Sequence, residues 1–309
     1  MSTNQLRALL LAAVVCLGTN GCASVKHLAV NKLGNALAGG GTAFASDDDP
    51  ELIRSAAPFS LKLMEGLLQQ SPEHHGLLLA TSSGFTQYAY AFVQEDADER
   101  ENQDIAASLA LRQRARRLYL RARDYALQGL ESAHPGFTNR LRADPQAAVK
   151  VLTKKDVPLA YWAAASWGAA TGILKNNTDL IAELPMVEAL IDRSLELNES
   201  YDHGAIHTFL ITYELVRPSG QGEPVARART HFERAVQLTG GQQAGPFVSL
   251  AEGVAVQQQD RAEFETLLHR ALAIDPDAKP EWRLANLVMQ QRARWLLSQA
   301  DNLIAKANN

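Results

Sequence analysis

Cysteine is almost absent from this chain of 309 residues. The two cysteines are Cys16 and Cys22, and no thiol follows residue 22. A disulfide framework and thiol catalysis are therefore excluded for the rest of the chain, and a metal site with cysteine ligands is disfavoured. The position of both thiols near the amino terminus points instead to a role in targeting.

Aromatic residues and net charge are also low, at 6% and −4. The small charge argues against nucleic acid as a partner, because no strong basic field is present. Hydrophobic residues make up 46% of the chain, and alanine and leucine are prominent among them. This composition favours a soluble helical protein over a β protein.

The amino terminus has the features of a lipoprotein signal. The apolar run at 8–17 is too short for a membrane span and is typical of a secretory signal core. Thr19-Asn20-Gly21 then precedes Cys22 as in a bacterial lipobox, although Thr19 replaces the usual leucine. We expect residues 1–21 to be removed and Cys22 to be acylated; ordinary cleavage beside an incidental cysteine is the alternative. Ala23, where aspartate would favour the inner membrane, points to the periplasmic face of the outer membrane.

The mature chain divides into an anchored segment, 22–47, and a helical domain, 48–309. Within the first, a short amphipathic helix at 23–38 is followed by three glycines that predict a flexible joint. Asp49-Pro50-Glu51 then has the sequence of a helix start, since Asp caps, Pro needs no N–H donor and Glu suits the positive end. Similar starts occur at Asp144-Pro145, Glu223-Pro224 and Lys279-Pro280, and Asp260 with Glu263 forms a capping box.

Degenerate repeats are the main sign of architecture. Two segments match the second helix of a tetratricopeptide repeat, with small and bulky residues at the expected spacing and a helix-ending Gly or Pro. They are Ala228, Phe232, Ala235 and Gly240, and then Phe264, Leu268, Ala271 and Pro276. Three weaker matches end near 72, 135 and 199. The sequence predicts an all-α fold, a right-handed superhelical stack of about four degenerate tetratricopeptide-like helix pairs with extra helices.

Several stretches carry a resemblance to a known family. They are Ser83 to Phe92, Lys154 to Trp162, Ser166 to Ala170, Gly245 to Glu252 and Glu281 to Asn286. Together they resemble the TatT family, the T component associated with TRAP transporters, over nearly all of residues 48–300. The resemblance implies a periplasmic lipoprotein that forms a homotrimer with a central pore. It also implies association with the transporter's solute-binding protein, which carries organic acids or other small, often amphiphilic, ligands.

Two aromatic clusters are candidates for lining a ligand site or pore. Tyr and Trp on the concave side of a repeat stack could hold an apolar ligand with a polar end. Packing between helices is the alternative and the one that the spacing favours. The residues concerned are Phe85, Tyr88 and Phe92 in the first cluster, and Tyr161, Trp162 and Trp167 in the second.

An arginine-rich segment follows an acidic one and is a candidate docking surface. Arg112, Arg116 and Arg117 could meet an acidic partner or lipid headgroups. A solvated hairpin with internal salt bridges is the simpler interpretation. His203 and His207 are spaced as on one helix face, but Gly204 replaces the glutamate of the hydrolytic zinc motif, so a structural role is favoured and no metal is expected.

No catalytic motif is present, so we expect a non-enzymatic protein without a cofactor. The first functional hypothesis is a TRAP transporter-associated component that docks the solute-binding protein and shelters a small hydrophobic or organic-acid ligand. The second is a general periplasmic scaffold that assembles envelope proteins without a ligand. Recovery of a TRAP solute-binding protein in a membrane pulldown would separate them.

Overall fold

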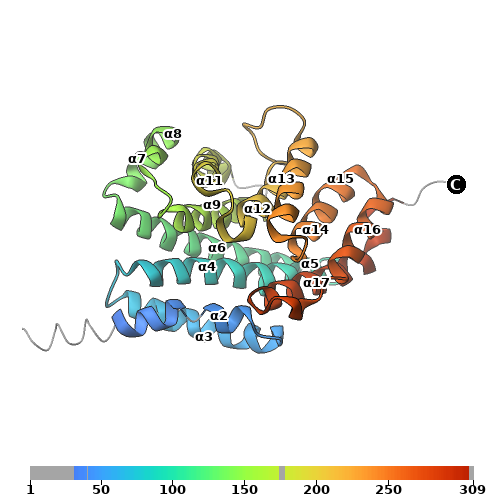
Figure 1. The fold of residues 1–309 in the computed structure, drawn as a ribbon, viewed down its shortest axis with the longest axis horizontal. Helices are drawn as coiled ribbons and strands as arrows, with labels where there is room; N and C mark the ends of the chain where they lie inside the picture. Colours follow the sequence, from blue (N-terminus) through green and yellow to red (C-terminus); the bar gives the residue numbers. More distant parts are fainter. Residues whose placement is uncertain (1–30, 40, 174–177, 306–309) are drawn as a thin grey trace, which may run out of the picture.

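The computed structural model describes residues 31–39, 41–173 and 178–305. Within these ranges every regular element is helical, which confirms the all-α class (Figure 1). None of the helices in this part of the chain is long and apolar enough to cross a membrane. The predicted signal peptide and Cys22 lie outside the described residues. The tetratricopeptide-like superhelix stays a prediction.

The amino-terminal half is a succession of long helices, each packed on the next. Residues 31–39 are helical and α2 (Gly41–Ala45) follows, so helix lies on both sides of residue 40, where a flexible joint was expected. The long helices are α3 (Pro50–Leu68), α4 (His75–Ala89), α6 (Ile105–Ala133), α9 (Val157–Gly172) and α11 (Leu184–Asn198). Consecutive members of this series are in contact, α3 with α4, α4 with α6, α6 with α9 and α9 with α11.

Shorter elements connect these helices. They are the π-helix η1 (Tyr90–Gln94), α5 (Glu95–Arg100), α7 (Phe137–Ala143), α8 (Pro145–Ala148), the 3-10 helix η2 (Val149–Val151), α10 (Thr178–Ala182) and the 3-10 helix η3 (Tyr201–Gly204).

The carboxy-terminal half continues the succession with shorter helices. They are α12 (Ala205–Tyr213), α13 (Pro224–Thr239), α14 (Gly245–Leu250), the π-helix η4 (Ala251–Ala255), α15 (Val256–Gln258), α16 (Arg261–Leu272), the 3-10 helices η5 (Pro276–Ala278) and η6 (Pro280–Trp282), α17 (Arg283–Ser298) and α18 (Ala300–Leu303). Here α12 packs on α13, α13 on α14, α14 on α16 and α16 on α17.

The predicted helix starts are confirmed at three aspartates. The Asp49 carboxylate accepts hydrogen bonds from two N–H groups at the start of α3, and the Asp144 carboxylate accepts one from the Ala147 N–H of α8. Asp260 accepts from the Glu263 N–H at 2.9 Å. Each cap satisfies donors that the first turn of a helix leaves unpaired. The start at Pro280 is different, since it begins the short η6 and α17 follows from Arg283.

Helix α9 lies at the centre of the larger core cluster. It contacts α4, α6 and α11, and its alanines allow these neighbours to approach closely. On α6, Gly129 faces Leu159 so closely that a Cβ there would lie 2.6 Å from the leucine Cδ1. A helix surrounded in this way is apolar on every side, which explains why α9 lacks a polar stripe.

The residues of the two stronger repeat matches are buried, as expected. Ala228 and Ala235 on α13, and Phe264 and Leu268 on α16, have no exposed surface. The Phe232 ring packs edge-on against Phe247 of α14, with centroids 5.5 Å apart. This part of the chain therefore has the predicted pattern, with small residues where the helices contact one another and bulky residues between them.

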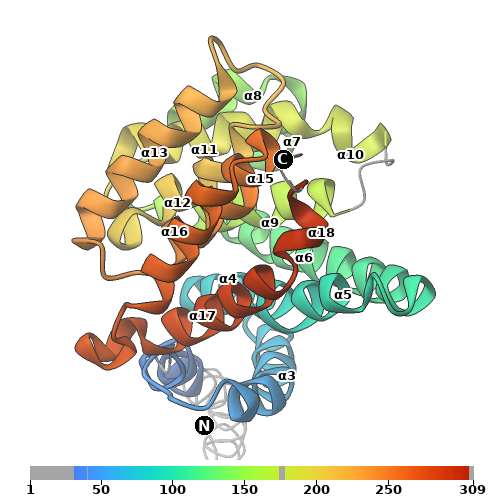
Figure 2. The ribbon, with the colours of Figure 1, turned by 90° about the vertical axis from the view of Figure 1, so that its right-hand side faces the viewer.

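The last long helix returns to the beginning of the fold. At the end of the succession, α17 packs on α16 and α14. It also contacts α2 and α3, beside which it lies in Figure 2. The Arg283 guanidinium donates a hydrogen bond to the Ser46 carbonyl at 2.9 Å. The described helices thus form a closed body in which both ends of the succession touch.

Candidate partner-docking surface

Helix α6 presents a row of arginines to solvent. Its buried face, with Ala115, Tyr119 and Ala122, meets α4 and α9. Arg114, Arg117 and Arg121 are exposed at spacings of three and four residues, so they share one solvent-exposed side of the helix. We call these three residues the arginine row. Within the described residues, neither Arg114 nor Arg117 pairs with a carboxylate, which leaves the positive charge of both available to a partner.

The three arginines that the sequence suggested for partner docking have different environments. Arg112 donates to Asp98 at 3.0 Å and to Glu101 at 2.8 Å, so its charge is neutralised within the chain. At Arg112 these contacts agree with the interpretation of α5 and α6 as a hairpin with internal salt bridges. Arg116 is half-buried, whereas Arg117 belongs to the arginine row. Arg114 and Arg121 belong to the same arginine-rich segment of the sequence, and the structure places both on the exposed side of α6 with Arg117.

Two aromatic side chains of α4 pack against arginines of the arginine row. The Arg121 guanidinium lies 5.4 Å from the centre of the Phe85 ring, and that of Arg114 lies 5.9 Å from the centre of the Tyr88 ring. Phe85 also stacks on Tyr125 of α6, with centroids 6.3 Å apart. Such cation–π contacts hold a guanidinium in place without neutralising it. Phe85 and Tyr88 of the first aromatic cluster therefore pack beneath the arginine row, whereas Phe92 lies against Arg54 of α3.

A shallow groove runs beside the arginine row, between α3 and α6. It consists of two adjoining hollows of about 470 and 250 Å³. Tyr125 and Gln128 line both hollows, Arg117 and Arg121 line the first, and Lys62 lines the second. Asp124 also lines the first hollow and Glu65 the second, so the groove is polar and carries charges of both signs.

One buried carboxylate stands at this groove. The Tyr125 hydroxyl donates to Glu65 Oε1 at 2.9 Å, and Glu65 is only 9% exposed. Burial and this hydrogen bond raise the pKa of Tyr125 to about 12. Lys62 and Arg121 also contact the Glu65 carboxylate. These contacts fix Arg121 at the groove and join α3 to α6.

Most of the predicted pocket aromatics are packed between helices. Phe85, Phe92, Tyr161 and Trp167 are at most 7% exposed. The Trp167 indole N–H donates to Glu183 Oε2 at 2.8 Å. Burial of this kind agrees with the packing interpretation for these four side chains. Tyr88 and Trp162 are half-buried, and a lining role for them stays a prediction.

The two histidines do not share a helix face as the sequence suggested. Asp202, His203 and Gly204 have positive φ angles of 43°, 54° and 94°, so the chain reverses before α12 begins. His203 instead packs against the Trp282 ring, with centroids 5.0 Å apart. His207 meets His231 of α13, with 2.9 Å between their Nδ1 atoms. In the described part of the chain, no group of three His, Cys, Asp or Glu residues is placed to hold a metal ion.

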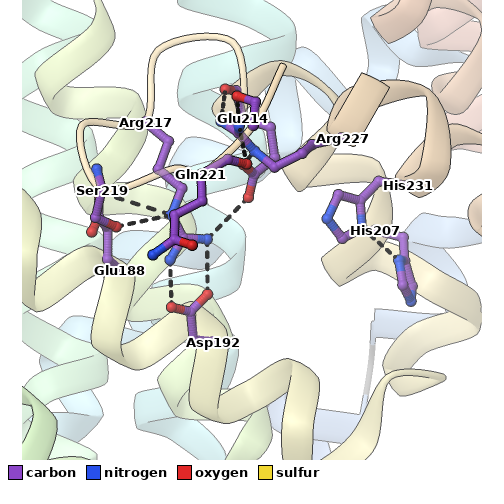
Figure 3. A network of polar contacts seen from close by, with 10 residues as sticks. Glu188, Asp192, His207, Glu214, Arg217, Ser219, Gln221, Arg227 and His231 are labelled. Atoms are coloured by element: carbon purple, nitrogen blue, oxygen red, sulfur yellow. Dashed lines mark hydrogen bonds and ion pairs between the residues drawn. The ribbon is translucent and has the colours of Figure 1, made fainter. Parts of the chain in front are cut away.

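A buried charge network fixes the loop between α12 and α13 (Figure 3). Arg217 donates to Asp192 Oδ1 at 2.9 Å and to Glu214 Oε1 at 3.0 Å. Arg227 also donates to Glu214 and binds the carbonyls of Gln221 and Gly222 at 2.8 Å. Burial alone would raise the pKa of Glu214, but the hydrogen bonds from the two arginines outweigh it and lower that pKa. The charges of this network are satisfied internally, so its role is to order the loop.

A second buried network joins the ends of the fold. Arg292 of α17 is 5% exposed and donates to Asp98 Oδ2 at 2.9 Å. It also donates to Glu252 of the π-helix η4. Glu95, the first residue after the π-helix η1, is 7% exposed beside these groups. Burial raises the pKa of Glu95 to about 8, and the charge of Arg292 only partly opposes this. Both π-helices therefore place an acidic residue at the same junction.

Comparison with known proteins identifies the family. The family model described as TRAP transporter T-component matches residues 46–304. This chain belongs to the TRAP transporter T-component family. A protein of Treponema pallidum (strain Nichols), itself uncharacterized, is 32% identical over 314 residues, covering 96% of this chain and 97% of its own length. As a T component, the chain is part of an envelope-associated transport system, and the family is a non-catalytic component of it.

Proposed function

We propose that the chain is a lipid-anchored protein of the periplasmic face of the outer membrane that docks the solute-binding protein of a TRAP transporter. The arginine row and the groove beside it form the docking surface in this proposal. Support comes from the family match over 46–304 together with the uncompensated charges of Arg114 and Arg117. Complementary charge steers such encounters and selects the partner.

The proposal extends to a ligand and to an oligomer. A small hydrophobic or organic-acid ligand released by the solute-binding protein would meet Tyr88, which lies under Arg114. The half-buried Trp162 is the second candidate for contact with such a ligand. An aromatic ring beside a guanidinium suits a molecule with an apolar body and an acidic end. The active form would be a homotrimer, as the family resemblance implies.

Charge reversal on the arginine row tests the docking proposal. The tagged full-length chain is purified from detergent-solubilised envelopes, and the co-purified proteins are identified by mass spectrometry. We expect a TRAP solute-binding protein with the wild-type chain and little of it with the double variant Arg114→Glu/Arg117→Glu. Arg294→Glu is the matched control, because Arg294 is an exposed arginine on a different helix, α17.

A general periplasmic scaffold is the alternative function. It would assemble envelope proteins on the same helices without a ligand and without a solute-binding protein. Recovery of assembly factors alone, in amounts unaffected by Arg114→Glu/Arg117→Glu, would favour that alternative over docking at the arginine row.

A further inference from the structure

Helix α3 has an apolar face that none of the described helices covers. Leu52, Phe59 and Leu63 are 55%, 73% and 37% exposed. They are spaced by seven and four residues, which places all three on one side of the helix. The buried residues Leu61 and Leu68 face the opposite way, toward the core. Helix α3 lies at the lower edge of Figure 1, in the same layer as helix 31–39 and α2.

The chain upstream determines what this face will meet. Helix 31–39 lies where α3 ends and α4 begins. Leu37 packs against the cluster formed by Leu67 and Leu68 of α3 with Leu77 and Leu78 of α4, and the Ser71 hydroxyl donates to Asn31 Oδ1 at 2.9 Å. Cys22 precedes residue 31 by nine positions. Even a fully extended chain of that length spans only about 30 Å. Acylation of Cys22 would therefore keep α3 within reach of the bilayer surface.

We propose that the face of α3 formed by Leu52, Phe59 and Leu63 rests on the lipid bilayer, with the Phe59 ring at the boundary between headgroups and acyl chains. This inference depends on the proposed acylation of Cys22. An amphipathic helix lying in the interface buries its apolar side to this depth and keeps its charged side in the headgroup layer.

The charged residues around the apolar face of α3 set the tilt of the helix. Asp47, Asp48 and Asp49 lie next to the Leu52 end, and such acids stay in water. Near the other end, the Lys62 side chain is 68% exposed beside Leu63, and a lysine stem can extend along the interface. The end with Phe59 and Leu63 thus lies deeper than the end with Leu52.

This orientation places the arginine row close to the membrane. Arg121 lies 3.6 Å from Glu65 of α3, so the arginine row is one helix layer above the lipid surface. Packed helix axes are about 8–10 Å apart. A solute-binding protein docked there would face the bilayer side of the periplasm, while the loop between α12 and α13 would point away from the membrane (Figure 1).

The scarcity of cysteine allows a site-specific test. In the processed and acylated chain, Phe59→Cys would supply the one free thiol, which takes a polarity-sensitive fluorophore. The labelled full chain is placed in vesicles of phosphatidylethanolamine and phosphatidylglycerol, with or without brominated acyl chains. Val216→Cys is the control, because Val216 is 63% exposed in the loop after α12.

The proposal predicts blue-shifted emission at position 59 that brominated lipid quenches, and neither effect at position 216. Unshifted emission at both positions would overturn it. A blue shift without quenching would also overturn it, because a second copy of the chain would then cover the face. Dye attached to Cys22, detected by peptide mass, would show a free thiol and remove the anchor on which the proposal rests. Since the vesicles contain no transporter, every outcome is independent of the docking proposal.

Discussion

Nη2 of Arg292 and Oδ2 of Asp98 lie 2.9 Å apart, although 194 positions separate these residues in the sequence. This contact joins α17 to α5 and closes the succession of helices on itself. Glu252 binds the same guanidinium, and Trp295 packs against it at 4.4 Å from the ring centre. This buried cation therefore links distant parts of the chain, together with the contacts of α17 to α2 and α3.

Replacement of Arg292 by methionine should strongly destabilise the fold. The variant Arg292→Met takes a buried guanidinium away from two carboxylates, although Asp98 keeps its contact with Arg112 and the Glu252 side chain is 37% exposed. We expect a loss of about 2–3 kcal/mol of the free energy of unfolding. Urea denaturation followed by circular dichroism measures the loss. Arg294→Met on the exposed side of the same helix is the control and should change stability by less than about 0.5 kcal/mol.

The free energy of unfolding should depend on pH through Glu95. Its pKa rises from an ordinary 4.5 to about 8 in the fold, mainly because of burial. The folded chain therefore holds a proton that the unfolded chain releases between these pH values. The contribution of Glu95 to stability is greatest below that window and declines as the pH rises through about 8.

The variant Glu95→Gln isolates this effect. It should be about 1–3 kcal/mol more stable than wild type at pH 8, with a smaller difference at pH 5. Urea denaturation at several pH values measures both. Glu99→Gln changes an exposed carboxylate in the same helix and serves as the control. Parallel pH profiles for wild type and Glu95→Gln would show that Glu95 is ionised in the fold.

Two aromatic substitutions separate core packing from a ligand role. Trp167→Ala removes a side chain that is 3% exposed and should cost about 3–5 kcal/mol of the free energy of unfolding. Tyr88→Ala removes a half-buried ring and should keep the fold intact by circular dichroism. It should instead weaken binding of a fluorescent fatty acid used as a probe. Unfolding caused by Tyr88→Ala would place that ring in the core and end its candidacy for the ligand site.

The lipid anchor has its own test in Cys22→Ser. Without the thiol no acyl chain can attach, so the variant should move from the membrane fraction to the soluble periplasmic fraction. Each buried CH2 of an acyl chain contributes about 0.8 kcal/mol, which a serine side chain cannot replace. Fractionation followed by immunoblotting measures the distribution. Cys16→Ser alters only the predicted signal peptide and should leave the chain in the membrane fraction.

Local features of the fold were predictable because they depend on neighbouring residues. Asp49, Asp144 and Asp260 cap helices as the sequence indicated, since a cap needs only a short side chain and the N–H groups that follow it. Burial of Ala228 and Phe264 followed from spacing alone. The hairpin of α5 and α6 followed from an acidic segment placed before a basic one.

Features set by distant contacts were not predictable. The return of α17 to α2 and α3 depends on pairs such as Arg283 with Ser46, which no local pattern reveals. The π-helices η1 and η4 each insert one extra residue per turn, and their sequences look like ordinary helix. The spacing of four residues between His203 and His207 suggests one helix face, whereas positive φ angles at Asp202 and His203 interrupt the helix.

The affinity of the purified solute-binding protein for the acylated full chain in detergent tests the central claim most directly. Interferometry would compare wild type, Arg114→Glu/Arg117→Glu and Arg294→Glu at low and high salt. Docking at the arginine row predicts that the double variant binds at least about tenfold more weakly and loses most of the salt dependence, while the control binds normally. Equal affinity of all three proteins would contradict the account.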